Sequence, residues 1–363
     1  MISFLKRPFQ FAGTAMHANV LLMCKLLLLL IIAHHFFFKI NDPFIPFIPF
    51  LDTFNEYPGI FKYVLRAGFV LGSFGLLFNY FVRSSALLVG TIVILGLVAS
   101  KPLFNNHTFV VGCALFLAGL TDNKQPPILL IYQLSLVYIG ASVNKFMDHD
   151  WWSGAFMNFW LEEARGNILY IEVASWLPEL VFAKILSYIA MFTEFIIGIT
   201  LLFKKYRTKS IWFIILFHFL LFSLTSFRFG HFIESLAIIL IAAIHYPKGY
   251  MKVSFTTRKL KGFQQLIRWM DWDKKIIWQT KVPENTSWLE LETNLGKVQN
   301  DKAMKDTLLF TPGFFAILFA LDVIVYLIFY NHRDMLFVVN LVWYWALIIF
   351  FLPINWSTIL KKN

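Results

Sequence analysis

Apolar residues fill long windows of the chain, and short polar segments separate these windows. Ten windows of roughly 15 to 23 mostly apolar residues approach or reach the length that a helix needs to cross a hydrocarbon core of about 30 Å. They lie at residues 18–38, 60–82, 85–100, 107–121, 127–143, 180–203, 210–227, 231–246, 308–330 and 335–353. The pattern predicts an all-α fold, a multi-pass transmembrane bundle of about ten spanning helices. The short windows 85–100 and 107–121 leave open whether both cross fully.

One long polar stretch, residues 247–307, interrupts the apolar pattern before the last two windows. It opens with an amphipathic stretch, 259–270, which is typical of a helix lying on an anionic membrane surface. Two strands, Lys275 to Val282 and Trp288 to Glu292, are expected around the turn 283–287. About 60 residues suffice for a small insert but not for an independent enzyme. We therefore predict two additional membrane helices at 308–353, after this insert.

Composition and charge agree with a membrane protein. The 363 residues are 58% hydrophobic and only 15% charged, which excludes a soluble or disordered chain. The two cysteines allow neither a disulfide framework nor a cysteine-based metal site. A net charge of +11 indicates basic cytoplasmic loops rather than nucleic-acid binding.

Basic residues in short loops predict the orientation, because Lys and Arg resist translocation. The two basic stretches, 204–209 and 248–268, are expected to be cytoplasmic. Counting through ten spans places both termini and the insert in the cytoplasm and the acidic segment 144–179 outside. The expected location is a plasma or inner membrane, with the lipid bilayer as solvent.

Six ionisable residues fall inside predicted spans, where each costs at least a few kcal/mol unless it faces a cavity or a partner. They are Lys25, Arg66, Glu194, His218, Glu234 and Asp322. One interpretation is a polar cavity within the bundle, to which Glu194, His218 and Glu234 contribute. The other is that each residue pairs with a neighbour or reaches the interface and has no chemical role.

His231 and Glu234 are three residues apart and would share one face of a helix. Together with His218 and Glu194 they could form a His/Glu metal site, but nothing fixes a third ligand, and we assign no metal. The sequence contains no nucleophile elbow, Walker loop or dinucleotide-binding motif, so serine hydrolysis and nucleotide-driven transport lack support.

The segment after the fifth window contains a lysine close in sequence to aromatic and acidic residues. Lys145 follows the small residues 140–142 and precedes Asp148, Asp150 and Trp151. Because burial disfavours the ammonium form, a lysine in an apolar setting can act as a general base if the carboxylates turn away. The alternative is an interfacial lysine that pairs with one of these acids and acts only as an anchor.

The helix ending in Lys145, followed by Asp150–Trp151–Trp152–Ser153–Gly154, resembles the signature of the vitamin K-dependent gamma-carboxylase-like, or HTTM, membrane family. The resemblance continues through Glu194, His218 and His231, so an HTTM-like domain is expected over residues 10–246. In the carboxylase, the matching lysine is thought to be the base that deprotonates reduced vitamin K. The resemblance thus implies Lys145 as catalytic base and a reduced quinone, such as vitamin K hydroquinone, as the cofactor. Asp150 and Trp151 would belong to the same site.

The leading hypothesis is a membrane-embedded enzyme acting on a lipid-soluble quinol or a translocated peptide at the extracytoplasmic face. The cavity or substrate-binding candidates are Glu194, His218, His231, Glu234, Asp150 and Trp151. The alternative is a non-catalytic membrane protein, either a partner in secreted-peptide maturation or immunity or a scaffold that holds a protein through 247–307. A transporter is the third interpretation, although no inverted repeat is visible.

Overall fold

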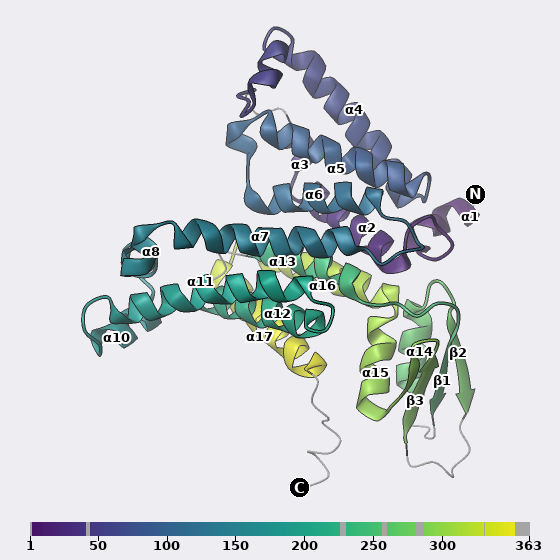
Figure 1. Ribbon diagram of the computed structural model, residues 1–363. Coiled ribbons are helices and arrows are strands. Elements are labelled where there is room, and N and C mark those ends of the chain that lie inside the picture. The colour runs from purple at the N-terminus through teal and green to yellow at the C-terminus, as the bar shows by residue number, and fades with distance from the viewer. Residues whose placement is uncertain are drawn as a thin grey trace.

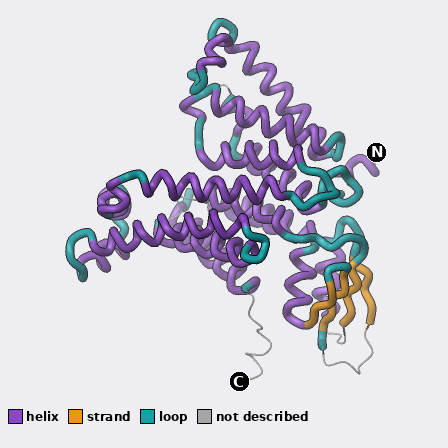
Figure 2. Tube along the Cα trace, viewed as in Figure 1, coloured by secondary structure: helices purple, strands orange, loops and turns teal. Residues whose placement is uncertain are grey.

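The computed structural model describes residues 2–40, 44–225, 230–255, 260–280, 287–329 and 331–352. Long helices make up most of the molecule, and a small sheet lies at one end of them (Figure 1). All described strands belong to this sheet, as the orange segments in Figure 2 show. The predicted helical bundle is therefore present, with a small mixed α/β insert.

Every predicted apolar window corresponds to a helix. Within the described residues, six helices are long and apolar enough to cross a membrane: α4 (Pro58–Leu77), α7 (Ile128–Phe146), α11 (Val181–Leu202), α12 (Arg207–Leu224), α16 (Pro312–Phe329) and α17 (Arg333–Phe351). Four shorter apolar helices occupy the other windows: α2 (Ala18–Ala33), α5 (Val82–Val98), α6 (Asn106–Leu120) and α13 (Gly230–Leu240), the last continued by a 3₁₀ turn at Ile241–Ala243. Multiple spans are thus supported, while the count of ten remains a prediction for the shorter four.

The short helices lie mainly between the long ones. They are α1 (Ile2–Lys6), α3 (Phe36–Lys39), α8 (His149–Ser153), α9 (Ala155–Asn158) and α10 (Ile168–Ser175), with a π-helical turn at Phe159–Glu163. The segment between α7 and α11 is thus folded into short helices. Figure 1 shows α8 and α10 at the end of the long helices opposite to the sheet.

Helix α2 is buried on almost all sides, which is typical of a helix that is apolar all round. Its one charged residue, Lys25, is 3% exposed. The Lys25 amine donates to the carbonyl oxygens of Arg7, Pro8 and Gln10 at 2.9 to 3.3 Å. The N-terminal segment therefore supplies the partners that a lysine needs at this depth.

Small residues allow the close approach of neighbouring helices. A Cβ atom at Gly90 of α5 would lie 2.3 Å from the backbone nitrogen of Phe116 in α6. Gly119 likewise meets the backbone of Arg83 and Leu87, so α5 and α6 touch through glycine at two points. This is the packing expected of membrane helices, whose association depends on van der Waals contact.

Helix α17, the last helix, packs against α12. Phe219 and Phe222 of α12 form a buried cluster with Ile348 of α17. Trp345 of α17 donates from its indole nitrogen to the Ser223 hydroxyl oxygen at 3.1 Å. Helix α17 therefore covers a face of α12, and α16 packs against α17 and α2.

The insert contains a four-stranded sheet with the order β2-β1-β3-β4. Its elements are β1 (Met251–Phe255), β2 (Ile276–Thr280), β3 (Leu289–Thr293), β4 (Gly296–Gln299), α14 (Lys261–Met270) and α15 (Asn300–Leu309). Both predicted strands exist as β2 and β3, but they do not pair with each other. Strand β1 lies between them, parallel to β2 and antiparallel to β3. The predicted turn falls largely on 281–286, outside the described residues.

Helix α14 is amphipathic, as predicted, but its apolar side is used within the protein. Ile267 and Met270 are buried and cluster with Leu308 at the end of α15, against Phe314 of α16. The expected helix on the membrane surface is therefore a packing element that joins the sheet to the bundle. Only Leu266 and Trp269 keep exposed apolar side chains on this helix.

Contacts place the described ends of the chain beside the insert. The backbone amides of Phe11 and Ala12 donate to the Asp273 carboxylate at 3.0 to 3.3 Å. The Lys305 amine donates to the Leu352 carbonyl at 2.7 Å. Both ends and the insert thus lie on one side, with α8 and α10 at the opposite end (Figure 1). This agrees with the relative orientation predicted from charge, although which side is cytoplasmic remains a prediction.

Candidate functional site

Helices α7 and α11 form the framework of the predicted catalytic segment. Gly198 of α11 faces Ile139 of α7, and a Cβ atom at Gly198 would lie 2.6 Å from the Ile139 side chain. The Ser135 hydroxyl donates to the Gly198 carbonyl oxygen at 2.6 Å. The absence of a side chain at Gly198 thus allows the two backbones to approach, and the buried hydrogen bond from Ser135 stabilises this contact.

This contact brings together two ionisable residues that are distant in sequence. Lys145, in the last turn of α7, forms an ion pair with Glu194 of α11. Their side chains are only 17% and 12% exposed. The Lys145 amine also lies 5.0 Å from the centre of the Trp151 ring, a distance typical of a cation–π contact. The ammonium is thus enclosed between a carboxylate and an indole ring.

A second polar pair lies deeper along the same face of α7. Tyr138 precedes Lys145 by seven residues, so both point to the same side of the helix. The Tyr138 hydroxyl is 2.7 Å from His218 Nε2 on α12. Both residues are buried, and His218 Nδ1 has no hydrogen-bond partner among the described residues. We call Tyr138, Lys145, Glu194 and His218 the lysine cluster.

The two acids that follow α7 do not pair with the lysine. Asp148 accepts a hydrogen bond from the Asp150 amide at 2.9 Å and so caps α8. Asp150 itself is exposed. Glu194 supplies the close carboxylate instead, so Lys145 lacks the acid-free apolar setting that a neutral lysine base requires.

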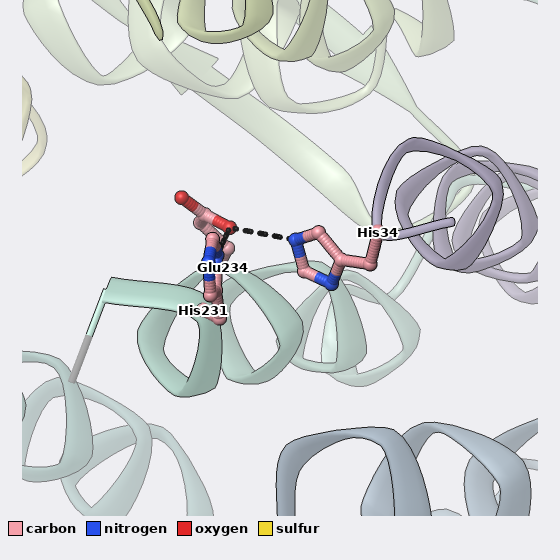
Figure 3. Close-up of side chains that lie close together, drawn as sticks. All are labelled: His34, His231 and Glu234. Atoms are coloured by element: carbon pink, nitrogen blue, oxygen red, sulfur yellow. Dashed lines mark hydrogen bonds and ion pairs between the residues drawn. The ribbon is translucent and has the colours of Figure 1, made fainter. Parts of the chain in front are cut away.

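His231 and Glu234 belong to a different group, so the predicted single cavity is not formed. Phe232 of α13 faces His218, with ring centres 5.4 Å apart. Consecutive residues on a helix point about 100° apart, so His231 and Glu234 face elsewhere. They meet His34 of α2, as Figure 3 shows. Glu194 and His218 thus share the lysine cluster, and Glu234 lies outside it.

Sequence reasoning overlooked Tyr138 and His34. Tyr138 could have been found from its spacing of two helical turns before Lys145. His34 carries no such signal, because it follows an apolar run and contacts residues about 200 positions later in the chain. Only the packing of α2 against α13 brings it to that group.

The fold and the enclosed ionisable residues define a helical membrane protein with polar groups inside its bundle. Residues 125–244 match the family model of the HTTM domain. The resemblance inferred from the sequence is thus confirmed for this segment, which runs from the start of α7 to the end of α13. No curated protein and no solved structure matches the chain. The match includes the whole lysine cluster but neither His34 nor the insert.

Proposed function

We propose that the protein is a membrane-embedded enzyme that removes a proton from a weak acid at the lysine cluster. The Lys145–Glu194 ion pair carries this proposal. In its charged form the pair holds one titratable proton, which lies on the Lys145 amine. The Glu194 carboxylate can therefore accept a second proton from a substrate. The ammonium then stabilises the anion left behind, as a fixed positive charge does in a site of low dielectric.

This mechanism changes the role that the family resemblance gives Lys145. A lysine paired with a carboxylate is a poor neutral base, because the partner favours its charged form. Glu194 becomes the proton acceptor, and Lys145 holds the substrate anion. The proton moves from the substrate O–H to a Glu194 oxygen, and the substrate oxygen keeps the electron pair opposite the Lys145 ammonium.

The substrate class follows from the position of the pair in the last turn of α7, at one end of a candidate membrane span. A lipid-soluble quinol can reach this depth from the bilayer, and its hydroxyl is the acidic group such a pair would ionise. Vitamin K hydroquinone is the candidate that the carboxylase-like resemblance suggests. A translocated peptide is the second candidate substrate.

The ionisation of a quinol in the presence of the reconstituted protein tests this proposal. The full chain in liposomes is mixed anaerobically with vitamin K hydroquinone, and the absorbance of the quinol anion is followed against pH. We expect the anion to appear at lower pH than in protein-free liposomes. Glu194→Gln and Lys145→Met should abolish the shift, whereas Lys145→Arg, which keeps the cation, should retain part of it. If Glu194→Gln and Lys145→Met show the same shift as the unaltered chain, the lysine cluster is not the site of quinol ionisation.

A scaffold function is the second candidate, and the sheet of the insert favours it. Strands β2 and β4 are the two edges among the described strands. An exposed sheet edge can accept an extended segment of another protein. A proline at Lys297 in β4, whose N–H faces away from β3 in this register, would block such pairing without disturbing the lysine cluster. Loss of a co-purified partner in Lys297→Pro, with normal quinol ionisation, would favour the scaffold.

A further inference from the structure

A group of three histidines and one glutamate lies outside the lysine cluster. His34 stands at the C-terminal end of α2, and His231 and Glu234 lie in the first turns of α13. Figure 3 shows one oxygen of the Glu234 carboxylate joined by dashed lines to both imidazole rings. One Glu234 oxygen is 3.2 Å from His231 Nδ1 and 3.8 Å from His34 Nε2.

Local backbone structure places these side chains. The spacing of three puts His231 and Glu234 on one face of α13, which packs against α2. Helix α2 stops after Ala33, and His35 takes a left-handed conformation with φ of 59°. The chain therefore turns at His35, and His34 is presented at the helix end rather than inside a continued helix.

A third imidazole borders the same group. His107, in the first turn of α6, has its ring centre 5.4 Å from that of His34 and 5.6 Å from that of His231. The His34 and His231 ring centres are 4.2 Å apart. Three imidazoles this close cannot all be charged without strong repulsion, and the neutral imidazole is the form that binds metal ions.

We propose that His34, His231 and Glu234 bind a divalent first-row transition-metal ion, for which Zn²⁺ is the best chemical match. Two imidazole nitrogens and a carboxylate oxygen are a known three-residue ligand set for zinc, which leaves one position open. We name these three residues the His/Glu site. His107 lies next to it and could fill or border the open position.

The distances fit such an ion after small side-chain adjustments. One ligand atom from each of the three residues lies within 4.8 Å of the other two. Tetrahedral zinc with bonds of about 2.0–2.1 Å holds its ligand atoms roughly 3.4 Å apart. We expect rotation about side-chain bonds to close this difference without movement of α2 or α13.

Two polar features near these residues favour a bound cation. His34 Nδ1 is buried and has no hydrogen-bond partner among the described residues. An orphaned buried nitrogen is costly, and coordination of an ion is one way to reorient and satisfy the ring. Asp322 of α16, which accepts a hydrogen bond from Tyr344 at 2.5 Å, is an electrostatic neighbour of both His231 and Glu234. A second carboxylate near the site would balance the charge of a divalent ion.

Metal binding by the full chain tests the proposal. The protein is purified in detergent through a tag without histidine, stripped with a chelator, loaded with Zn²⁺ and freed of unbound metal. Mass spectrometry of the metal should give about one Zn²⁺ per chain. Glu234→Gln and His231→Asn should each weaken binding by more than about tenfold. Substitution of residues that only hydrogen-bond to metal ligands already lowers metal affinity by about this factor.

His35→Asn is the matched control. His35 neighbours His34 but is exposed, and asparagine tolerates its left-handed backbone. This variant should bind Zn²⁺ like the unaltered chain. Equal binding by the unaltered chain, Glu234→Gln and His231→Asn, or far less than one ion per unaltered chain, would overturn the proposal.

A spectroscopic measurement on the unaltered chain keeps the test decisive if a variant fails to fold. Co²⁺ in place of Zn²⁺ should give the strong visible absorption of a four-coordinate site with nitrogen and oxygen ligands. A weak spectrum typical of six-coordinate Co²⁺ would count against the His/Glu site. The proposal is independent of the lysine cluster, so loss of metal binding and loss of quinol ionisation can be observed separately.

Discussion

The Lys145–Glu194 ion pair makes a quantitative prediction about stability. Glu194→Gln keeps the side-chain shape but leaves the ammonium of Lys145 without its counter-ion, at 17% exposure. Removing one partner of a buried pair costs about 3 to 5 kcal/mol. Because Lys145 lies in the last turn of α7 and can extend toward the interface, we expect the lower value, about 3 kcal/mol.

A double-mutant cycle separates the pair from its surroundings. Lys145→Met should also lower the free energy of unfolding by about 3 kcal/mol, because it leaves the Glu194 carboxylate unpaired. If the two side chains act on each other, the double variant should lose about 4 kcal/mol rather than about 6, a coupling energy of about 2 kcal/mol.

Unfolding by sodium dodecyl sulfate in mixed micelles, followed by tryptophan fluorescence, measures these free energies. The control pair is Lys252–Glu292 in the sheet, 3.9 Å apart with side chains 50% and 57% exposed. Its coupling energy should stay below about 1 kcal/mol because water screens it. A coupling energy within about 0.5 kcal/mol of zero for Lys145 and Glu194 would refute the ion-pair reasoning, and the proposed proton acceptor with it.

Three further predictions concern packing, orientation and pH. Gly90→Ala should destabilise the bundle by about 1–3 kcal/mol because its Cβ atom would overlap the backbone of α6, whereas Gly140→Ala, with nothing within 4 Å, should have little effect in the same unfolding assay. A membrane-impermeant thiol reagent on intact cells should label a cysteine at exposed Glu163 but not one at exposed Leu295 of the insert, and the reverse pattern would invert the orientation. Burial raises the pKa of Asp306 in α15 above its unfolded value. The ionised carboxylate therefore lowers the free energy of unfolding at high pH, and this loss disappears as pH falls and the group is protonated. Asp306→Asn should therefore raise the melting temperature near neutral pH and lose this effect below about pH 3, under the unfolded aspartate pKa of about 3.9, and an equal gain at both pH values would contradict this assignment.

The sequence predicts the helices of this protein well because their signal is local. A window such as 180–203 is apolar throughout, and α11 spans Val181–Leu202. The signal is weaker in the insert, where β1 was missed. Its short alternating run Met251–Phe255 gains its place only by pairing with two strands that follow much later in the chain.

The two candidate sites could not be predicted from local sequence patterns, because they are formed by contacts between residues far apart in the chain. Glu194 meets Lys145 because Gly198 lets α7 and α11 touch, and nothing in the sequence states that these two helices are neighbours. The sequence places Asp148 and Asp150 close after Lys145, and pairing with one of them was one of the two interpretations. Both acids stay at the exposed start of α8 because capping that helix satisfies Asp148.

The packing of α17 against α12 has a consequence for biosynthesis. The ribosome makes α12 more than 100 residues before α17 is complete, which corresponds to roughly 5 to 20 seconds of synthesis. During that time Phe219 and Phe222 can face lipid at little cost, since lipid tails are as apolar as their later partners. The Ser223 hydroxyl gains the Trp345 indole, and the His/Glu site gains Asp322 as a neighbour, only when the last two helices insert. We therefore expect the lysine cluster to assemble in the nascent chain before Asp322 reaches the His/Glu site.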